Sequence, residues 1–447
     1  MKSKIFYVCG NCGYRSARWQ GRCPSCESWN SFLEEETKSS TKKSSRAKAE
    51  TPILISEVKN LTTQRITIGI NEFDRVLGGG LVPGSVVLIG GDPGIGKSTL
   101  LLQVSGKTKP GDCLYVSGEE SKQQIALRFK RVFQNQEDLQ ILPETNLETI
   151  LATLENNNYD FAIIDSIQSV YSSDIDGIPG SLTQIRECAI KLTEFAKRTN
   201  TSVFLIGHVT KEGFIAGPKV LEHMVDVVLQ FEGEKNYSYR ILRTLKNRFG
   251  STNEIGIFEM VDSGLREVSN PSELFLAEVT NTPGVAISAV IEGSRPIIIE
   301  SQALVTSTGF SYPQRTTNGF DIKRLQLILA VLEKRIGISF SNKDVFVNIA
   351  GGFRIDDTSL DLAIACALIS SNSEISIPDK TVIIGEIGLT GEVRNVPFIE
   401  QRINEAIKLG FTNIILPEVS KGKFKKKTHT RYEFVTNLND IFSKIFG

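Results

Sequence analysis

Hydrophobic and polar positions follow two alternating patterns through the middle of the chain. Amphipathic stretches typical of helices fall at residues 99–106, 122–133 and 147–156. Apolar runs typical of buried strands fall between and around them, at residues 85–90, 113–117, 139–142, 161–165 and 203–206. Because strands that alternate with helices form mainly parallel sheets covered by helices, we predict an α/β domain over residues 56–268.

The pattern changes after Asn270-Pro271. Short β-branched runs at residues 286–291 and 296–299 precede a helical pattern at 323–334, and glycine-punctuated strands then surround another helix at 360–370. We therefore predict a second α/β domain over residues 269–447.

The first 32 residues follow neither pattern but contain four of the seven cysteines, arranged in two CxxC pairs. An odd number of cysteines, with four gathered at one end, favours metal ligands over disulfides. Four thiolates at this spacing suit tetrahedral zinc, although similar sets also hold iron. We predict a four-cysteine zinc module over residues 1–32, with the ligands Cys9, Cys12, Cys23 and Cys26.

This module is also basic and aromatic, a composition that suits contact with DNA or with another protein. A purely structural role is the simpler interpretation. The basic residues of the module are Lys2, Lys4, Arg15, Arg18 and Arg22, and the aromatic residues among them are Tyr14, Trp19 and Trp29. Residues 34–50 then carry almost no apolar side chains, and we predict a flexible linker over residues 33–55.

Composition indicates a globular protein of two or three domains, because 447 residues with 40% hydrophobic content can bury several cores. Equal numbers of acidic and basic residues, 51 each, exclude a polycationic coat protein but permit a local basic channel. Residues 1–8 lack an apolar stretch of signal-peptide length, and no segment reaches the length needed to cross a bilayer. We expect a cytoplasmic protein with no membrane partner.

The most specific motif lies between the strand predicted at 85–90 and the helix predicted at 99–106. It is a complete phosphate-binding loop, followed by Thr99, and reads Gly91-Asp92-Pro93-Gly94-Ile95-Gly96-Lys97-Ser98. In such a loop, successive backbone N–H groups surround the β- and γ-phosphates at the positive end of the helix. Lys97 adds a positive charge and Ser98 a ligand for magnesium, so we predict binding and hydrolysis of ATP with Mg²⁺.

Acidic residues follow two of the predicted strands. The strand at 161–165 ends in Asp165, which we expect to hold the magnesium shell. Glu119 and Glu120 follow the strand at 113–117, which we expect to lie next to the phosphate-loop strand. One of them can orient or deprotonate the attacking water; we favour Glu119, while Glu120 is alternatively a helix-start charge.

Further motifs give the chain a resemblance to known families. Residues 67–74 (TIGINEFD), 77–81 (LGGGL) and Gly84 resemble the RecA-type ATPases. Together with the cysteine module, residues 115–121 (YVSGEES) and 246–250 (KNRFG) are similar to the RadA (Sms) family of bacterial DNA repair proteins, over essentially the whole chain. This resemblance implies a homo-hexameric, DNA-dependent ATPase that processes recombination intermediates by branch migration or DNA unwinding, alongside the RecA recombinase.

In this family the KNRFG segment is implied to act across a subunit boundary, with Lys246 and Arg248 as catalytic residues for a neighbour's γ-phosphate. Both side chains fall on one face of the extended run at 239–246 if it continues, and paired cations suit phosphate. A solvated pair of charges on an edge strand is the alternative.

The region after the strand at 203–206 contains two further candidates. His208 is a plausible sensor of the γ-phosphate, although a structural histidine is about as consistent with the sequence. The glycine-rich loop between Lys211 and His223 is implied by the RecA resemblance to face a central pore and touch single-stranded DNA, with Lys219 and Phe214 as contacts. A surface loop without function is equally consistent.

The second α/β domain resembles the proteolytic domain of Lon, through residues 351–352 (GG), 357–359 (DTS), 361–365 (DLAIA) and 385–392 (GEIGLTGE). A Lon-type protease needs a serine nucleophile and a lysine base. Ser359 falls at or near the nucleophile position, but Glu400 occupies the lysine position, which disfavours proteolysis. We expect the Ser359 hydroxyl to satisfy backbone donors at a helix start instead, and the domain to serve as an oligomerisation platform.

A cationic patch near the end of the chain suits duplex DNA, although a soluble, highly charged loop is equally consistent. It consists of Lys421, Lys423, Lys425, Lys426 and Lys427.

Three classes of function are therefore open. The first is the DNA motor that the resemblance implies. The second is an ATP-gated regulatory ring that does not move DNA, and the third, disfavoured by Glu400, is an ATP-dependent protease.

Overall fold

The computed structural model of the chain describes residues 4–9, 14–24, 29–37, 54, 64–109, 111–133, 138–207, 218–233, 238–272, 276, 282–309, 312–351 and 354–446. It divides into two compact units, Met1–Glu267 and Val268–Gly447, one residue before the predicted start of the second domain. Among the described residues, the helices are all too short or too polar to span a membrane.

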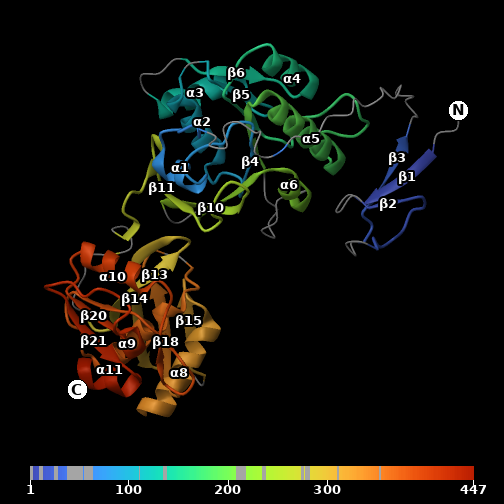
Figure 1. Ribbon diagram of the computed structural model, residues 1–447. Coiled ribbons are helices and arrows are strands. Elements are labelled where there is room, and N and C mark those ends of the chain that lie inside the picture. Colours follow the sequence, from blue (N-terminus) through green and yellow to red (C-terminus); the bar gives the residue numbers. More distant parts are fainter. Residues whose placement is uncertain are drawn as a thin grey trace. The chain divides into compact units, whose positions relative to one another are not determined.

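The first unit contains a nine-stranded sheet in the order β12-β11-β10-β9-β4-β8-β7-β5-β6 (Figure 1). Six neighbouring strands, from β9 to β6, are parallel, and β10, β11 and β12 are added antiparallel at one edge. The strands are β4 (Val86–Gly91), β5 (Cys113–Ser117), β6 (Gln140–Pro143), β7 (Phe161–Asp165), β8 (Ser202–Ile206), β9 (Val227–Glu232), β10 (Tyr239–Asn247), β11 (Ile255–Val261) and β12 (Gly264–Glu267).

Helices cover both faces of this sheet. Because successive strand residues point to opposite faces, Val87 and Ile89 of β4 join the core under one group of helices, while Val86 and Leu88 join the core under the other. The first group is α1 (Asn71–Val76), α2 (Lys97–Lys107) and α3 (Lys122–Val132); the second is α4 (Leu147–Glu155), α5 (Leu182–Thr199) and α6 (Pro218–Met224). The predicted parallel-sheet α/β class is confirmed.

The strand order corrects one expectation. We predicted the strand at 113–117 to lie next to the phosphate-loop strand, but β4 pairs with β8 and β9, and β8 and β7 separate it from β5. Hydrophobic patterning specifies strands but not their order, and two strands that come later in the chain fill the gap. The two strands that end near carboxylates, β5 and β7, are nevertheless neighbours, with Ser117 opposite Asp165.

The N-terminal segment forms a small antiparallel sheet in the order β2-β1-β3. Its strands are β1 (Lys4–Cys9), β2 (Arg15–Ser16) and β3 (Phe32–Thr37). Strand β3 continues to Thr37, which pairs with Lys4, so the sheet extends into the segment 33–55 that we predicted to be a linker. An edge strand is held by backbone pairing and tolerates polar side chains, which is why composition alone misplaced this boundary.

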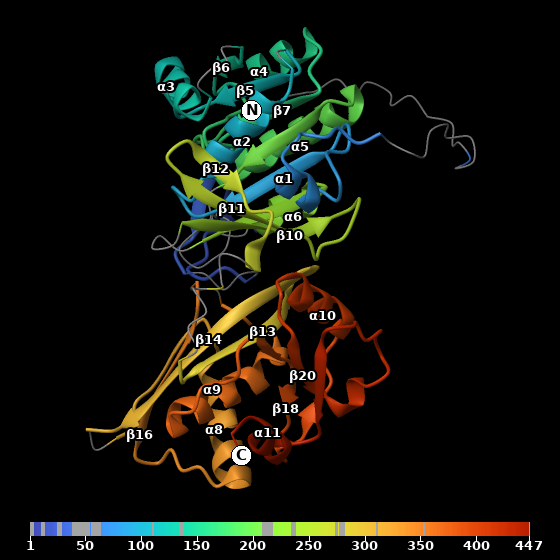
Figure 2. The ribbon, with the colours of Figure 1, turned by 90° about the vertical axis from the view of Figure 1, so that its left-hand side faces the viewer.

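The second unit contains a seven-stranded mixed sheet in the order β15-β16-β14-β13-β17-β20-β21, and Figure 2 shows its long strands β13, β14 and β16 together. A two-stranded sheet, β18-β19, lies apart from it. The strands are β13 (Val285–Glu292), β14 (Arg295–Ser307), β15 (Arg315–Asn318), β16 (Lys343–Ile349), β17 (Thr381–Ile383), β18 (Glu386–Ile387), β19 (Val393–Arg394), β20 (Asn413–Pro417) and β21 (Arg431–Val435).

Helix α9 (Asp361–Ser373) is buried through its first ten residues, and its contacts with β13 and β14 place it against the sheet. The other helical elements of this unit are α8 (Ile322–Ile336), η2 (Thr358–Leu360), α10 (Ile399–Lys408), η3 (Glu418–Ser420) and α11 (Leu438–Ile445).

Candidate nucleotide site and associated clusters

The phosphate loop joins the end of β4 to the start of α2. Gly91, Gly94 and Gly96 have φ angles of 150°, 78° and 119°. A Cβ atom at Gly91 would lie 2.6 Å from the carbonyl oxygen of Phe231, so only glycine allows β4 to turn this close to β9. The loop therefore leads into the N-terminus of an eleven-residue helix, an arrangement suited to phosphate.

Lys97 lies beneath the loop and is only 4% exposed. Its Nζ donates to the carbonyl oxygens of Gly91, at 2.7 Å, and Asp92, at 2.9 Å. Burial lowers the pKa of Lys97 to about 8, although the nearby carboxylates of Asp165, Asp92 and Glu119 act in the opposite direction. A bound phosphate group would supply a negative charge that stabilises the protonated form of this buried lysine.

Asp165 is held by a hydrogen-bond network from β5 and α3. Tyr115 Oη donates to Asp165 Oδ2 over 2.5 Å, and Arg128 Nη2 donates to Tyr115 Oη over 3.0 Å. Burial, followed by the charge of Asp165, raises the pKa of Tyr115 well above its usual value, so the phenol remains a donor. The network orients the carboxylate through one of its two oxygens. Asp165 and the Ser98 hydroxyl are hard oxygen donors of the kind that Mg²⁺ prefers.

The two glutamates after β5 have different surroundings. Glu119 Oε1 accepts a hydrogen bond of 2.7 Å from Ser166 Oγ, beside Asp165. Glu120 Oε1 instead pairs with Arg128 Nη1 at 2.9 Å, on helix α3. Glu119 therefore adjoins Asp165 and Lys97, while Glu120 neutralises the arginine that supports Tyr115.

Arg248 lies at the opposite end of the sheet from the phosphate loop of the same chain. Its Nη1 contacts Asp226 Oδ1 at 3.2 Å, and Asp226 Oδ2 accepts a hydrogen bond of 3.1 Å from the N–H of Val86. Val86 is the first residue of β4 and Gly91 the last. At about 3.3 Å per residue, these ends are roughly 17 Å apart.

Lys246 lies at the same end as Arg248, because β10 runs antiparallel to β9. Its Nζ donates to the carbonyl oxygens of Glu222, at 2.6 Å, and Val225, at 2.8 Å, where α6 ends. Burial and the nearby charge of Arg248 lower the pKa of Lys246. Strand β10 as a whole lies inside the sheet, since residues 239–243 pair with β11, but at Lys246 it pairs with β9 alone, and Arg248 follows the end of the strand.

Several other candidates lie outside the described residues, namely His208, Phe214, Cys12 and Cys26. For Lys219, the structure describes the backbone as part of α6 and not the side chain.

Cys9 and Cys23, one from each CxxC pair, are fully buried and belong to one small cluster with Phe32. The Cys9 sulfur lies 3.1 Å from Ser31 Oγ. Bringing a cysteine of each pair to one buried place fits a thiolate metal site. Cys12 and Cys26 do not belong to the described part of the chain. Within that part, no group of three metal-binding side chains occurs.

Ser359 is fully buried and contacts an arginine. Arg402, which is 1% exposed, donates through Nη1 to Ser359 Oγ at 2.7 Å and to the carbonyl oxygen of Ala289 at 2.6 Å. A guanidinium stays protonated and cannot remove a proton from the serine hydroxyl. The residue opposite Ser359 is therefore Arg402, and our assignment of Glu400, which is exposed on α10, to that place is wrong.

The expected capping role of Ser359 is also wrong. Asp357 caps η2, since its Oδ1 accepts the N–H of Ser359 at 2.9 Å. Asp357 Oδ2 also pairs with Arg402 Nη1 at 2.7 Å. Although burial acts to raise the pKa of Asp357, the charge and hydrogen bonds of Arg402 hold it below its usual value.

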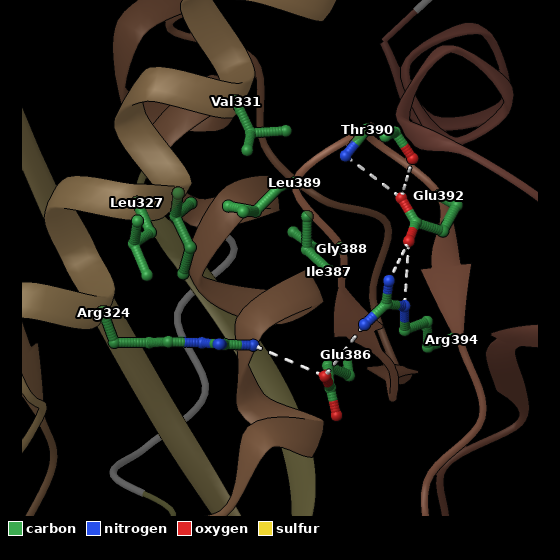
Figure 3. A pocket seen from close by; sticks show the side chains of 11 residues that line it. Arg324, Leu327, Val331, Glu386, Ile387, Gly388, Leu389, Thr390, Glu392 and Arg394 are labelled. Atoms are coloured by element: carbon green, nitrogen blue, oxygen red, sulfur yellow. Dashed lines mark hydrogen bonds and ion pairs between the residues drawn. The ribbon is translucent and has the colours of Figure 1, made fainter.

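A pocket of about 270 Å³ in the same unit lies between α8 and the β18-β19 hairpin (Figure 3). Leu327, Val331 and Leu389 form its apolar wall. Its charged groups neutralise one another, since Glu386 lies 3.9 Å from Arg324 and 4.0 Å from Arg394. Ser359 does not line this pocket, so the hydroxyl and the cavity do not form a peptidase cleft.

The lysine-rich segment after β20 folds against β21. Lys426 Nζ lies 5.1 Å from the centre of the Phe434 ring and Lys421 Nζ 5.8 Å from it, while Lys421 also pairs with Glu418 at 3.1 Å. The segment thus has a defined conformation at the edge of the sheet, and its contact with duplex DNA stays a prediction.

Comparison with protein-family models gives three matches. A model described as an AAA domain matches residues 55–213, one for a rubredoxin metal binding domain matches residues 7–34, and one for subunit ChlI of Mg-chelatase matches residues 322–420. The first contains the phosphate loop, and the second contains all four cysteines.

Full-length relatives decide the family. The chain is 51% identical to the DNA repair protein RadA of Streptococcus pyogenes serotype M1, over 100% of both chains. It is 50% identical to RadA of Halalkalibacterium halodurans and 48% identical to RadA of Bacillus subtilis, over 100% of this chain and 99% of each relative. This chain belongs to the RadA family. It is an ATP hydrolase with a DNA repair function, and its N-terminal segment matches a metal-binding domain.

Among solved structures, an ATPase domain matches 46% of this chain and 92% of its own length at 14% identity, with a TM-score of 0.41, too low a likeness to add to the RadA assignment.

Three residues of the candidate nucleotide site were not assigned a role from the sequence: Tyr115, Arg128 and Ser166. Tyr115 lies in a buried strand among apolar residues, and Arg128 lies in an amphipathic helix, so neither pattern distinguishes them from ordinary core and surface positions. The capping box at the start of α3, Ser121 with Gln124, marks where that helix begins but does not indicate which of its residues face Asp165.

The pKa of Lys97 predicts a pH dependence of nucleotide binding. Because the lysine loses its charge as pH rises through about 8, ATP affinity should fall about tenfold between pH 7 and pH 9. Equilibrium binding of a fluorescent ATP analogue measures this. Replacing the exposed Lys122 with methionine should leave the profile unchanged, whereas constant wild-type affinity across this range would contradict the assignment.

Tyr115→Phe should raise the magnesium concentration that half-saturates ATPase activity by about tenfold, since a hydrogen-bond partner of a metal-binding carboxylate is removed. The matched control is Tyr159→Phe, which removes a phenol bonded to Gln140 rather than to Asp165. An equal magnesium requirement in the two variants would show that Tyr115 does not position Asp165.

Arg402→Met should destabilise the second unit by about 3 kcal/mol, because it leaves the Asp357 carboxylate without its partner. Amide hydrogen exchange in α9 and α10 measures the effect locally. Since the pKa of Asp357 is lowered in the folded state, the wild-type advantage is present above about pH 4 and is lost as pH falls further. The control, Arg354→Met, breaks an exposed ion pair and should leave exchange unchanged.

Proposed function

We propose that this RadA-family ATPase works as a ring, six-membered as its sequence resemblance implies, in which each nucleotide site is completed by Lys246 and Arg248 of a neighbouring copy. The ring couples hydrolysis to the processing of single-stranded or branched DNA in recombination intermediates, by branch migration or unwinding, alongside RecA.

The position of Arg248 supports this proposal most directly. Its anchor, Asp226, is hydrogen-bonded to Val86 at the start of β4, while the phosphate loop begins at the other end of that strand. A side chain at that place does not reach the γ-phosphate of its own subunit. A neighbour placed against this end of the sheet would receive both cations, which suit the charge that develops during phosphoryl transfer.

In the proposed site of one subunit, different residues bind the phosphates, hold Mg²⁺ and position the attacking water. The loop from Gly91 to Gly96 would surround the phosphates, with Lys97 supplying charge, and Ser98 and Asp165 would hold Mg²⁺. Glu119 is the proposed water-positioning residue, because it adjoins Asp165 through Ser166, whereas Glu120 is paired with Arg128.

Helix α6 offers a physical route between DNA and hydrolysis. It begins at Pro218, inside the segment between Lys211 and His223 that we predicted to be a loop and proposed to touch single-stranded DNA, and it ends where Lys246 binds the carbonyl oxygens of Glu222 and Val225. A displacement of α6 by bound DNA would therefore alter where Lys246 points. This contact supports the proposal that bound DNA stimulates turnover.

The N-terminal module is proposed to hold zinc through Cys9, Cys12, Cys23 and Cys26. The burial of Cys9 and Cys23 in one cluster supports a thiolate site. Metal analysis of the full chain purified without added metal distinguishes zinc from iron.

A test by subunit mixing follows. Lys246→Ala should bind ATP normally but lose most DNA-stimulated ATPase activity, and Lys97→Ala should lose activity because its own site is defective. Mixed in equal amounts, the two variants should regain a substantial part of the wild-type rate, since an intact finger can then face an intact site.

Recovery in the mixture can arise only if the finger acts in trans. Absence of recovery, although mixed rings are demonstrated by co-purification, would mean that Lys246 only caps α6. A wild-type ATPase rate that single-stranded DNA does not change would favour the regulatory ring over the motor.

A further inference from the structure

The two tryptophans of the chain, Trp19 and Trp29, both lie in the N-terminal module and are 54% and 72% exposed. Their rings flank Gly21: the position of a Cβ atom on this glycine is 3.8 Å from Trp19 Cη2 and 4.0 Å from Trp29 Cζ3. A side chain at position 21 would therefore occupy the space between the two indoles. Two large aromatic faces exposed this close together are costly to hydrate and indicate a binding surface.

Hydrogen bonds hold the backbone that carries the two indoles. Arg22 and Trp29 form an antiparallel bridge, and the N–H of Asn30 donates to the carbonyl oxygen of Gly21 at 2.8 Å. The turn before Trp19 is closed by Ser16, whose Oγ donates to the carbonyl oxygen of Arg18 at 2.6 Å. Because the backbone at both tryptophans is already held in the unbound protein, little backbone conformational entropy is lost on binding.

The charge around the indoles is positive. The Arg22 guanidinium lies 5.9 Å from the centre of the Trp29 ring, and Arg18 is exposed in the adjoining turn. Residues 1–32 contain five basic residues against one acidic residue, Glu27. The acidic run Glu34–Glu36 lies in β3, at the other edge of the small sheet from β2.

We propose that Trp19, Trp29 and Arg22 form a stacking platform for the unpaired bases of single-stranded DNA, separate from the nucleotide site. Aromatic rings stack on any base, and arginine contributes both cation–π contact and attraction to phosphate, a combination typical of sequence-independent single-strand binding. A duplex presents its bases already stacked and does not fit such a surface. An apolar protein segment is the competing occupant, which the positive charge does not favour.

The chain supplies its own probe, because its tryptophan fluorescence comes only from this module. In the metal-loaded full-length protein, oligothymidylate of about 20 nucleotides should quench this fluorescence by base stacking, and a duplex of equal length should quench it far less. No quenching at low salt, or equal quenching by the duplex, would overturn the proposal.

Variants at Trp29 separate aromatic stacking from general apolar contact. Trp29→Leu should weaken binding of a fluorescently labelled oligothymidylate to the module by at least about fivefold, and Trp29→Phe should retain most of the affinity, since stacking on one base contributes about 1–3 kcal/mol. Ala17→Ser, an exposed change in the same turn, is the matched control. Equal affinities of the leucine and phenylalanine variants would rule out stacking.

Further measurements separate DNA stacking from misfolding of a variant and from binding of a protein partner. Metal content and ATPase activity without DNA should be the same in all four proteins, which shows that each variant is folded. Quenching that occurs with a protein partner but not with oligothymidylate would assign the surface to protein binding instead. Because quenching requires neither hydrolysis nor a trans finger, the platform and the proposed motor can fail independently.

Discussion

The direction of β4 is the constraint on which the nucleotide site depends. The strand is buried on both faces and paired on both sides, so its two ends are fixed relative to each other. One end carries Gly91 and the phosphate loop, and at the other end the N–H of Val86 donates to the carboxylate of Asp226, which also holds Arg248. The buried strand thus keeps phosphate-binding groups and the proposed finger cations of one chain apart, and it is this separation that makes a second copy necessary in the proposed mechanism.

Burial next to the phosphate loop determines the charge state of the groups in the candidate site. Lys97 lies under the loop, where few waters can solvate its charge, and its lowered pKa records that cost. At Asp165, hydrogen bonds offset the cost of removing a charged group from water. Tyr115 donates to the carboxylate, and Arg128 donates to Tyr115 and pairs with Glu120. Glu120 is neutralised by Arg128, while Glu119 stays beside Asp165. The two adjacent glutamates therefore differ in their chemistry.

The sequence was sufficient for features that depend on local pattern. Buried parallel strands are continuous apolar runs, so the strand at 113–117 was predicted with its observed bounds, and the phosphate loop was evident from its glycines and lysine. Features that depend on which strands become neighbours were not accessible. The wrong placement of β5 beside β4, the missed role of Tyr115 and the choice of Glu400 over Arg402 all concern contacts between distant segments.

In the second unit, the resemblance to Lon extends to the position of one serine but not to its chemistry. Its Ser359 lies where the resemblance to Lon suggested a nucleophile, yet the hydroxyl is buried, donates to the carbonyl oxygen of Ala289 and accepts a hydrogen bond from Arg402. These contacts join β13, η2 and α10, three elements that come from distant parts of the unit. A permanently charged guanidinium in this position serves packing and cannot serve proton transfer. The buried cluster therefore holds three distant segments of the second unit together.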